Sequence, residues 1–419
     1  MTVNKKRVAV IGAGIVGACV ARYLQRDGHD VVLIDPLTPG EGASSGNAGC
    51  FNPSSLVPIA GPDTFRQIPK YLMDPLGPLS IRWSYLPQLS PWLIRYGLAG
   101  TPEKIRRQAQ ALKSLISPCF DALLPLVEDA GARDLVRRDG ILIVYRSKEG
   151  VAADARAWAL RRENGVDWEE FDHEQLRAFD PNLALDVKFG KYVPHNGHTV
   201  NPERLVKTIV DAILKTGGRL IKAEAQGFAF DGDKLVAIET MGGRIEADTA
   251  VLAAGAHSKP LAVLAGDKIP LETERGYHVM IRNPAIQPRV PTTDSENKFV
   301  ATPMQFGVRL AGTVELAGLK AAPNWKRSEI LVKRIGSLFP ALGRNYTMNE
   351  MSYWMGHRPS LPDSLPVMGR SKRSADIIYA FGHQHVGMTA APYTGVVIAD
   401  LISGRPSPID LKPFRADRF

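Results

Sequence analysis

Apolar and polar positions follow two different patterns over the first part of the chain. Residues 8–11 are apolar at every position, which is typical of a central parallel strand buried on both faces. Residues 15–26 carry apolar side chains at helical spacing, and Gly28 marks the expected end of that helix. A second apolar run at 31–34 predicts a strand that ends at Asp35. The segment therefore predicts a strand–helix–strand unit.

The same two patterns predict the elements of the remaining chain. Further helices are predicted at residues 102–129, 152–164, 202–215, 326–338 and 388–402. Asn201 is the expected N-cap of the helix at 202–215, and Pro202 is its first residue. Further strands are predicted at residues 140–145, 220–225, 235–240, 244–246, 247–256 and 377–381, with strand-like alternation over 269–320, for example at 276–281 and 306–310.

Residues 51–100 differ from the rest because they are rich in proline and aromatic residues. Prolines at this density predict short, interrupted helices. We expect Trp83, Trp92 and Tyr96 to pack in the core or in a lid over a site. A peripheral membrane contact is the alternative for these side chains.

Composition narrows the class of protein. The chain has 419 residues, 44% of them hydrophobic, which is enough for two soluble domains. Its formal net charge of +9 comes from scattered basic residues, so we expect no nucleic-acid partner. We find no signal peptide and no apolar run long enough to span a membrane. Three cysteines without C-x-x-C spacing (Cys19, Cys50 and Cys119) favour a cytoplasmic protein without a zinc or other metal site.

A G-x-G-x-x-G motif connects the first predicted strand and helix. Gly12 permits a tight turn, Gly14 allows the backbone to approach a pyrophosphate, and Gly17 allows the helix to pack closely on the sheet. The positive end of the helix dipole points at the same anion. Asp35 follows about twenty residues later, where an acidic side chain accepts hydrogen bonds from a ribose diol. The motif predicts a dinucleotide site and leaves NAD and FAD equally open.

Small residues fill the loop at 36–49, which reads PLTPGEGASSGNAG. Backbone amides and the hydroxyls of Ser44 and Ser45 approach a phosphate or a flat ring closely in such a loop. A flexible linker is the alternative. Because the loop lies between two strongly patterned segments, we expect a cofactor contact.

Several separated motifs resemble those of one family. They are VAVIGAGIVGACVARYL near the N-terminus, SSGNAG at 44–49, VNPERLV at 200–206, DTAVLAAGAHS at 248–258, RGYH at 275–278, WMGHRP at 354–359 and FGHQHVGMTAAPYTG at 381–395. With these motifs the chain resembles the FAD-dependent D-amino-acid oxidoreductases, the superfamily of D-amino-acid oxidase, glycine oxidase and sarcosine oxidase. Among them it looks most like the bacterial D-amino-acid dehydrogenases.

The resemblance implies a fold and a division into domains. The expected class is α/β, with a Rossmann-like FAD-binding domain and a second α+β substrate domain built on an antiparallel sheet, as in D-amino-acid oxidase. We expect residues 1–50, 195–265 and 355–419 to form the discontinuous FAD-binding domain. Residues 51–194 and 266–354 would then form the substrate-binding or cap domain.

The resemblance also implies site residues for a noncovalently bound FAD. The expected contacts come from Gly12, Gly14, Ile15, Val16, Gly17, Asp35, Ser44, Ser45, Asn47, Ala48, Ala254, Gly255, Val386, Gly387 and Met388. The last three lie at the start of a helix, whose dipole would stabilise negative charge on the reduced flavin.

Four residues are candidates for the catalytic site: Arg358, Tyr277, His278 and His383. Arg358 matches the arginine with which the family binds a substrate carboxylate, and a guanidinium suits that role because it is always charged and binds two oxygens. The alternative is a structural ion pair. The resemblance also implies that Tyr277 and His278 lie on a strand that faces the flavin. For His383 and His385, beside the last flavin turn, we expect a packing or pocket-lining role.

The implied reaction is oxidative deamination of a D-amino acid to the 2-oxo acid. A hydride would pass from Cα to flavin N5, and the electrons would pass on to a quinone or another carrier. The alternatives are a secondary-amine enzyme acting on hydroxyproline, proline or a sarcosine-type substrate, direct use of oxygen, and a flavoprotein subunit of an electron-relay complex. The expected location is the cytoplasm, with peripheral contact to the inner face of the membrane as the alternative.

Overall fold

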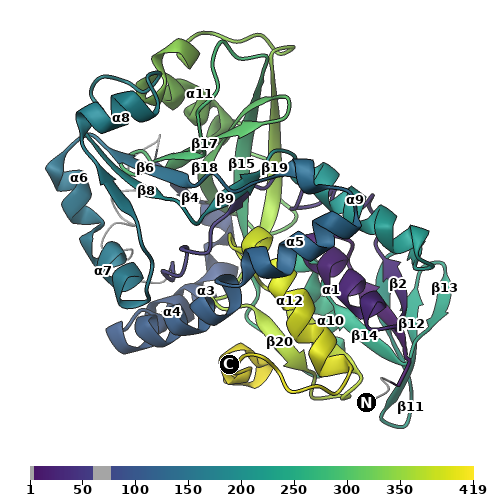
Figure 1. Cartoon of the computed structure of the whole chain (residues 1–419). Helices are drawn as coiled ribbons and strands as arrows, with labels where there is room; N and C mark the ends of the chain where they lie inside the picture. The colour runs from purple at the N-terminus through teal and green to yellow at the C-terminus, as the bar shows by residue number, and fades with distance from the viewer. Residues whose placement is uncertain (1–3, 60–76) are drawn as a thin grey trace.

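The computed structural model describes residues 4–59 and 77–419. Its elements form two lobes, with the start of the chain in one lobe and long connections passing between both (Figure 1). One large sheet lies in each lobe. The cavity described below lies where residues of the two sheets meet.

A six-stranded sheet is built from strands that lie far apart in the sequence. Its order is β10 (Arg219–Ile221), β2 (Asp30–Ile34), β1 (Arg7–Ile11), β14 (Thr249–Leu252), β21 (Ile377–Phe381) and β20 (Val367–Arg370). All neighbours are parallel except β20 and β21. The predicted strands at 8–11, 31–34 and 377–381 are confirmed. The strand predicted at 247–256 is shorter because its second half forms turns beside the cavity.

The second large sheet has nine strands and is mainly antiparallel. Only β16 with β6 and β18 with β4 pair in parallel. Its order is β19 (Met351–Ser360), β15 (Glu272–Arg282), β18 (Gly307–Leu316), β17 (Phe299–Met304), β16 (Thr292–Asp294), β6 (Ile141–Tyr145), β8 (Phe189–Val193) and β7 (Glu169–Phe171), with β4 (Leu79–Ile81) beside β18. The strands at 276–281 and 306–310 are therefore parts of β15 and β18. The domain boundaries given above stay a prediction.

Two small three-stranded sheets complete the strands of the described chain. One contains β11 (Ala225–Asp231), β12 (Lys234–Thr240) and β13 (Gly243–Glu246), and the other β3 (Cys50–Phe51), β9 (Gly197–Thr199) and β5 (Val136–Arg137). The strand expected at 220–225 is wrong, because the chain leaves β10 at Ile221 and begins β11 at Ala225. Those two strands belong to different sheets.

Most predicted helices are present. They include α1 (Ile15–Arg26), α9 (Pro202–Lys215), α11 (Lys326–Leu338) and α12 (Gly387–Ile402). The Asn201 side chain caps α9 by accepting a hydrogen bond from the Arg204 N–H. The helix expected at 102–129 is two helices, α4 (Pro102–Ile116) and α5 (Cys119–Asp129), because Pro118 interrupts it. The helix at 152–164 is likewise α6 (Lys148–Ala153) and α7 (Ala155–Glu163). The pattern missed α8 (His173–Phe179) and α10 (Ser258–Leu264).

The expectation of short helices is wrong for α3 (Leu86–Ala99), which continues through Pro91. Pro91 has no N–H for the carbonyl oxygen of Pro87, four residues earlier. The Ser90 hydroxyl donates to that oxygen at 3.0 Å instead, so this carbonyl keeps a hydrogen-bond donor. Pro62, Pro69 and Pro75, which also supported the expectation, lie outside the described residues.

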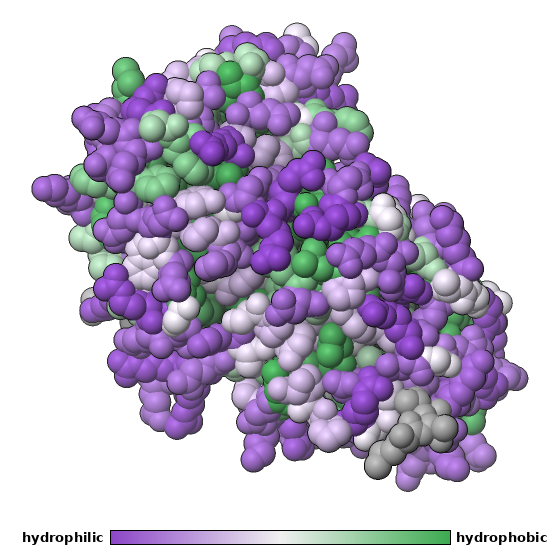
Figure 2. Space-filling model, in the orientation of Figure 1, coloured by the Kyte–Doolittle hydropathy of each residue, from purple (hydrophilic) through white to green (hydrophobic). Residues whose placement is uncertain are grey.

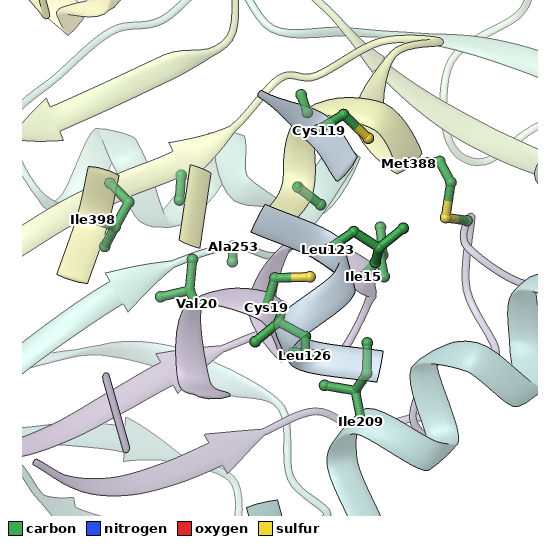
Figure 3. Close-up of a cluster of buried hydrophobic side chains, with 14 of the residues drawn as sticks. Ile15, Cys19, Val20, Cys119, Leu123, Leu126, Ile209, Ala253, Met388 and Ile398 are labelled. Carbon is green, nitrogen blue, oxygen red and sulfur yellow. The ribbon is translucent and has the colours of Figure 1, made fainter. Parts of the chain in front are cut away.

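The main core packs α1 against α12, α5 and α9. Figure 3 shows Cys19 and Val20 of α1 among Leu123 and Leu126 of α5 and Ile209 of α9. The helices α1 and α12 also lie close together. A Cβ at Gly395 would lie 2.8 Å from the Cys19 carbonyl oxygen. The prediction that Cys19 is a core residue is confirmed. This core fixes the first and last helices, and the N-termini of both face the cavity.

On the face in Figure 2, hydrophobic residues occur in small separate groups among hydrophilic ones. Trp92 and Tyr96 are buried as expected, whereas Trp83 is 69% exposed, so its expected core position is wrong. Over residues 4–59 and 77–419, the helices are all too short or too polar to cross a bilayer.

We predict that Gly17→Ala destabilises the fold, because the added Cβ would lie 1.9 Å from the carbonyl oxygen of Gly12. Helix α1 would have to move away from β1. Overpacking of this kind costs about 1–3 kcal/mol of unfolding free energy. Thermal melting followed by circular dichroism checks this, with Gly42→Ala as the control because its Cβ would meet no atom within 4 Å. Equal melting temperatures for the two variants would contradict the prediction.

Candidate active site

A single deep cavity of about 1690 Å³ connects the first strand–helix turn with the edge of the nine-stranded sheet. Its walls come from the turn before α1, the loop at 36–52, strands β15 and β19 and the start of α12. The volume exceeds that of ordinary small-molecule pockets, which hold about 300–1,000 Å³. The cavity is therefore large enough for two ligands or for one long one.

The turn before α1 is shaped to bring backbone close to a ligand. Gly12 has a φ of +112°, and a Cβ there would lie 2.4 Å from the Ala253 carbonyl oxygen. Helix α1 starts after Gly14 without a side-chain cap and without an acidic residue in its first turn. The Ile15 N–H instead donates to Ser44 Oγ at 3.0 Å. The turn leaves a glycine-walled space at the positive end of a helix, which suits a phosphate group.

Asp35 lies at the end of β2 on the cavity wall. Its carboxylate accepts hydrogen bonds from the N–H groups of Ala13 at 2.7 Å and Leu37 at 2.8 Å. Burial raises the pKa of Asp35, while these two N–H groups act in the opposite direction. The hydrogen bonds fix the carboxylate beside the glycine turn, where a ribose would lie.

The loop at 44–49 is held from behind by the nine-stranded sheet. Arg309 of β18 donates from Nη1 to the carbonyl oxygens of Ser45 at 2.9 Å and Asn47 at 2.5 Å. The Nδ1 atom of His278 lies 3.0 Å from the carbonyl oxygen of Gly46, so the ring donates there. His278 also stacks on Trp354 with 5.1 Å between ring centroids. Burial lowers the pKa of Arg309 to about 10 and that of His278 to about 3.

Arg358 lines the cavity on the edge strand β19. In the antiparallel register Arg358 lies opposite Glu274, and Gly356 lies opposite Gly276. The two glycines leave room on this face: a Cβ at Gly276 would lie 2.5 Å from Arg358 Nη2, and one at Gly356 would lie 1.9 Å from the Trp354 ring. Within the described chain, Arg358 has no carboxylate within the 4.0 Å of an ion pair. Its guanidinium is therefore available to an anionic ligand.

Tyr277 and His383 also line the cavity, but their polar atoms are already bonded. The Tyr277 hydroxyl donates to Glu315 at 2.5 Å and accepts from the Asn324 N–H at 2.9 Å. The Nε2 atom of His383 lies 3.1 Å from Thr394 Oγ1, and burial lowers its pKa to about 3. Both side chains thus support the wall in a fixed, uncharged form.

Most of the predicted site residues lie together around this cavity. Those that line it are Gly12, Gly14, Ile15, Val16, Asp35, Ser44, Asn47, Ala48, Ala254, Gly255, Tyr277, Arg358, His383, Val386, Gly387 and Met388. Gly17, Ser45 and His278 are not in its wall. Gly17 packs α1 on the turn, the Ser45 hydroxyl donates to Glu41 and Gly42 carbonyls, and His278 lies behind the loop.

Sequence reasoning did not identify Arg309, Glu274 and Trp354. Arg309 and Glu274 are single polar positions in strands, and nothing local distinguishes them from surface residues. Trp354 begins the WMGHRP motif, in which the resemblance assigns a role only to Arg358. Glu274 is only 8% exposed, and burial raises its pKa while the charge of Arg358 lowers it. Within residues 4–59 and 77–419, no group of three or more His, Cys, Asp or Glu side chains could hold a metal ion.

Comparisons with known proteins agree with this geometry. The profile of the family described as "FAD dependent oxidoreductase" matches residues 7–401. The chain is 45% identical over 417 residues to a D-amino-acid oxidase of Bradyrhizobium diazoefficiens, covering 99% of both. It is 30% identical to a D-amino acid dehydrogenase of Paramagnetospirillum magneticum, again covering 99% of both.

Solved structures share the fold. Glycine oxidase from Geobacillus kaustophilus superposes with a TM-score of 0.73 at 21% identity and 99% coverage of both chains. L-proline dehydrogenase from P. horikoshii gives a TM-score of 0.73 at 19% identity, covering 99% of this chain and 98% of the other. The expected fold class is thereby confirmed.

The chain belongs to the family of FAD-dependent oxidoreductases, and FAD is its cofactor. The site fits this group, because the glycine turn, the uncapped start of α1 and the fixed Asp35 carboxylate lie in line along one wall of a sufficiently large cavity. The expected enzyme class, an FAD-dependent amino acid oxidoreductase, agrees with these relatives.

We predict that Arg309→Met weakens FAD binding about tenfold or more, since charge-assisted hydrogen bonds of this kind contribute about 1.5–3 kcal/mol each. The loop at 44–49 would lose the hydrogen bonds that attach it to β18. Fluorescence titration of the apoprotein with FAD measures the change. Arg107→Met is the matched control, because Arg107 forms only an exposed ion pair with Glu103 on α4. An affinity equal to that of this control would contradict the prediction.

Proposed function

We propose that the protein oxidises D-amino acids to the corresponding 2-oxo acids by way of the imino acids. The observation that carries the proposal is Arg358, a cavity-lining guanidinium with no carboxylate partner in the described chain. A guanidinium fork binds a carboxylate through two parallel hydrogen bonds. The relatives named D-amino-acid oxidase and D-amino acid dehydrogenase support an α-amino acid as the carboxylate ligand.

The proposed roles of the remaining site residues follow from their place in the wall. Gly12, Gly14 and Asp35 would hold the ADP half of FAD, and the loop at 44–49 with Val386–Met388 would hold the flavin half. The cofactor supplies the electron acceptor for the substrate hydride. The protein orients the substrate Cα–H bond and excludes water from the site.

We propose noncovalent FAD. Cys19 and Cys119 are buried in the core, away from the cavity. Cys50 lines the cavity, but burial raises the pKa of its thiol to about 12. A thiol that stays protonated at neutral pH is a poor nucleophile.

An apolar wall supports a preference for apolar side chains. Trp92 and Tyr96 of α3 stack with 5.1 Å between ring centroids, and the Tyr96 hydroxyl donates to the Ile59 carbonyl oxygen at 2.7 Å. The wall is continued by Ile59, Leu79, Ile81, Leu93, Leu316 and Leu319. An uncharged substrate side chain gains by burial against this wall, whereas a charged one loses its hydration there.

We predict that apolar D-amino acids bleach the flavin band of the FAD-loaded protein without air. D-Leucine and D-phenylalanine should reduce it faster than their L-isomers, D-aspartate, hydroxyproline or sarcosine. Arg358→Met, which keeps the length of the side chain but not its charge, should lose about 100-fold or more in apparent substrate affinity. Reduction by a secondary amine alone would favour the alternative substrate class. No reduction by any of these compounds would contradict the proposal.

The electron acceptor follows from the same experiment. We propose oxygen as a candidate beside a quinone or another carrier, because the 45% identical relative is named an oxidase. Readmitting air to the reduced protein distinguishes them. Reoxidation within seconds supports oxygen, and persistence of the reduced band supports a carrier.

We also propose a peripheral membrane contact at α3. Ile94, Arg95 and Leu98 are exposed on α3, and Arg82 and Trp83 are exposed just before it. Exposed apolar groups flanked by arginines suit an anionic lipid surface.

We predict that the protein sediments with vesicles containing anionic lipid and not with neutral ones. Ile94→Ser together with Leu98→Ser should reduce this binding about tenfold or more, because two apolar side chains no longer insert. Leu214→Ser, which removes an exposed leucine of α9, is the control. Absence of sedimentation at low salt would contradict a membrane contact and would favour a protein acceptor in solution.

A further inference from the structure

The turn between β21 and α12 is fastened to the strand that carries Arg358. Gln384 has a φ of +48°, its N–H donates to the Pro359 carbonyl oxygen at 3.0 Å, and its Nε2 donates to the Leu361 carbonyl oxygen at 2.7 Å. Pro359 directly follows Arg358. These hydrogen bonds place the next residue of the turn, His385, at a fixed position close to the guanidinium.

The His385 ring faces the cavity with one nitrogen available. The side chain is exposed and lines the cavity. Its Nε2 lies 3.3 Å from Ser55 Oγ, and the described residues offer Nδ1 no hydrogen bond. The surrounding protein and, to a smaller extent, the charge of Arg358 lower the pKa of His385 to about 4. A neutral imidazole that donates from Nε2 presents an unprotonated Nδ1, which accepts a hydrogen bond.

We propose that His385 Nδ1 accepts a hydrogen bond from the amino group of the substrate while Arg358 binds its carboxylate. The inference deepens and rests on the proposed amino acid oxidation. Both groups of an α-amino acid are attached to one carbon, so their binding partners must be neighbours. His385 and Arg358 both line the cavity, and a hydrogen bond joins the residues beside them, from the Gln384 N–H to the Pro359 carbonyl oxygen.

Other groups beside Arg358 are less suited to this role. Glu274 is only 8% exposed. It lies opposite Arg358 in the pairing of β15 with β19. His383 is buried and already bonded to Thr394. The Ser55 hydroxyl oxygen lies 3.3 Å from His385 Nε2, where it accepts from that nitrogen in the tautomer that leaves Nδ1 unprotonated. Among these residues, His385 alone combines an exposed ring with a free nitrogen.

Two fixed anchors and an apolar wall give the site three points of contact. Arg358 binds the carboxylate and His385 binds the amine in either enantiomer. The two enantiomers then differ in whether the hydrogen or the side chain at Cα faces the apolar wall. Only one enantiomer can then direct its side chain to the apolar part of the cavity while its Cα–H bond faces the cofactor. The amine anchor therefore contributes to stereoselectivity as well as to affinity.

The test compares a substrate with an analogue that lacks the amine. The ligands are D-phenylalanine, followed by anaerobic flavin reduction, and 3-phenylpropanoate, followed by the change it causes in the flavin spectrum. His385→Leu removes the acceptor at similar size, and His385→Asn keeps a polar acceptor near Nδ1. His195→Asn is the control, because His195 is exposed and outside the cavity wall.

We expect His385→Leu to weaken D-phenylalanine binding about tenfold or more, since an unpaired amine in a site loses about this factor. Binding of 3-phenylpropanoate should change by less than about twofold, and His385→Asn should restore most of the affinity for the amino acid. Equal losses for both ligands, or no loss for either, would overturn the inference. If the unchanged protein is reduced by no amino acid, the proposed function itself has failed, and the His385 variants do not decide it.

Discussion

The attachment of the loop at 44–49 to β18 is the contact on which the site depends. Arg309 donates to two carbonyl oxygens of this loop, and His278 and Trp354 enclose Gly46 from the same sheet. The loop follows the first strand–helix–strand unit, which ends at Ile34. Through it, the glycine turn and the nine-stranded sheet line one cavity.

Burial of the Arg309 charge costs free energy, and the hydrogen bonds of its guanidinium offset part of that cost. Arg309 is 8% exposed, and no carboxylate lies within ion-pair distance among the described residues. Its Nε has no hydrogen-bond partner in the described chain. Burial of a charge without a counterion costs free energy, and hydrogen bonds to backbone carbonyls offset only part of it. A buried arginine under these conditions indicates a positional role, which is to fix the carbonyl groups of Ser45 and Asn47 in the loop.

At the opposite end of the cavity, neighbouring elements also hold side chains in fixed positions. Glycines at 276 and 356 open the surface of the nine-stranded sheet, so that Arg358 and Trp354 lie flat over it. The turn before α12 is tied to β19 next to Arg358. Charged, aromatic and apolar groups thus line the same cavity from β15, β19, α3 and the start of α12. The proposed substrate site combines groups from all four elements.

The sequence determined the elements whose causes are local. Apolar runs and glycine spacing define β1, α1 and β2, and an N-cap with a following proline defines α9. Local chemistry also explains where prediction failed. Pro118 lies between α4 and α5, whereas α3 continues through Pro91, where the Ser90 hydroxyl donates to the carbonyl oxygen of Pro87. The family motifs placed Arg358 and the glycine turn in the site because their spacing is distinctive.

Tertiary structure alone decided which strand residues reach the cavity. Arg309 is more than 250 residues from the loop it holds, and its pattern in β18 is that of any polar strand position. Tyr277 and His278 are adjacent in sequence, yet one supports the cavity wall and the other lies behind the loop, because strand side chains alternate in direction. Such facts depend on pairing between distant strands. The local sequence does not predict that pairing, because a strand residue has the same propensities with any neighbouring strand.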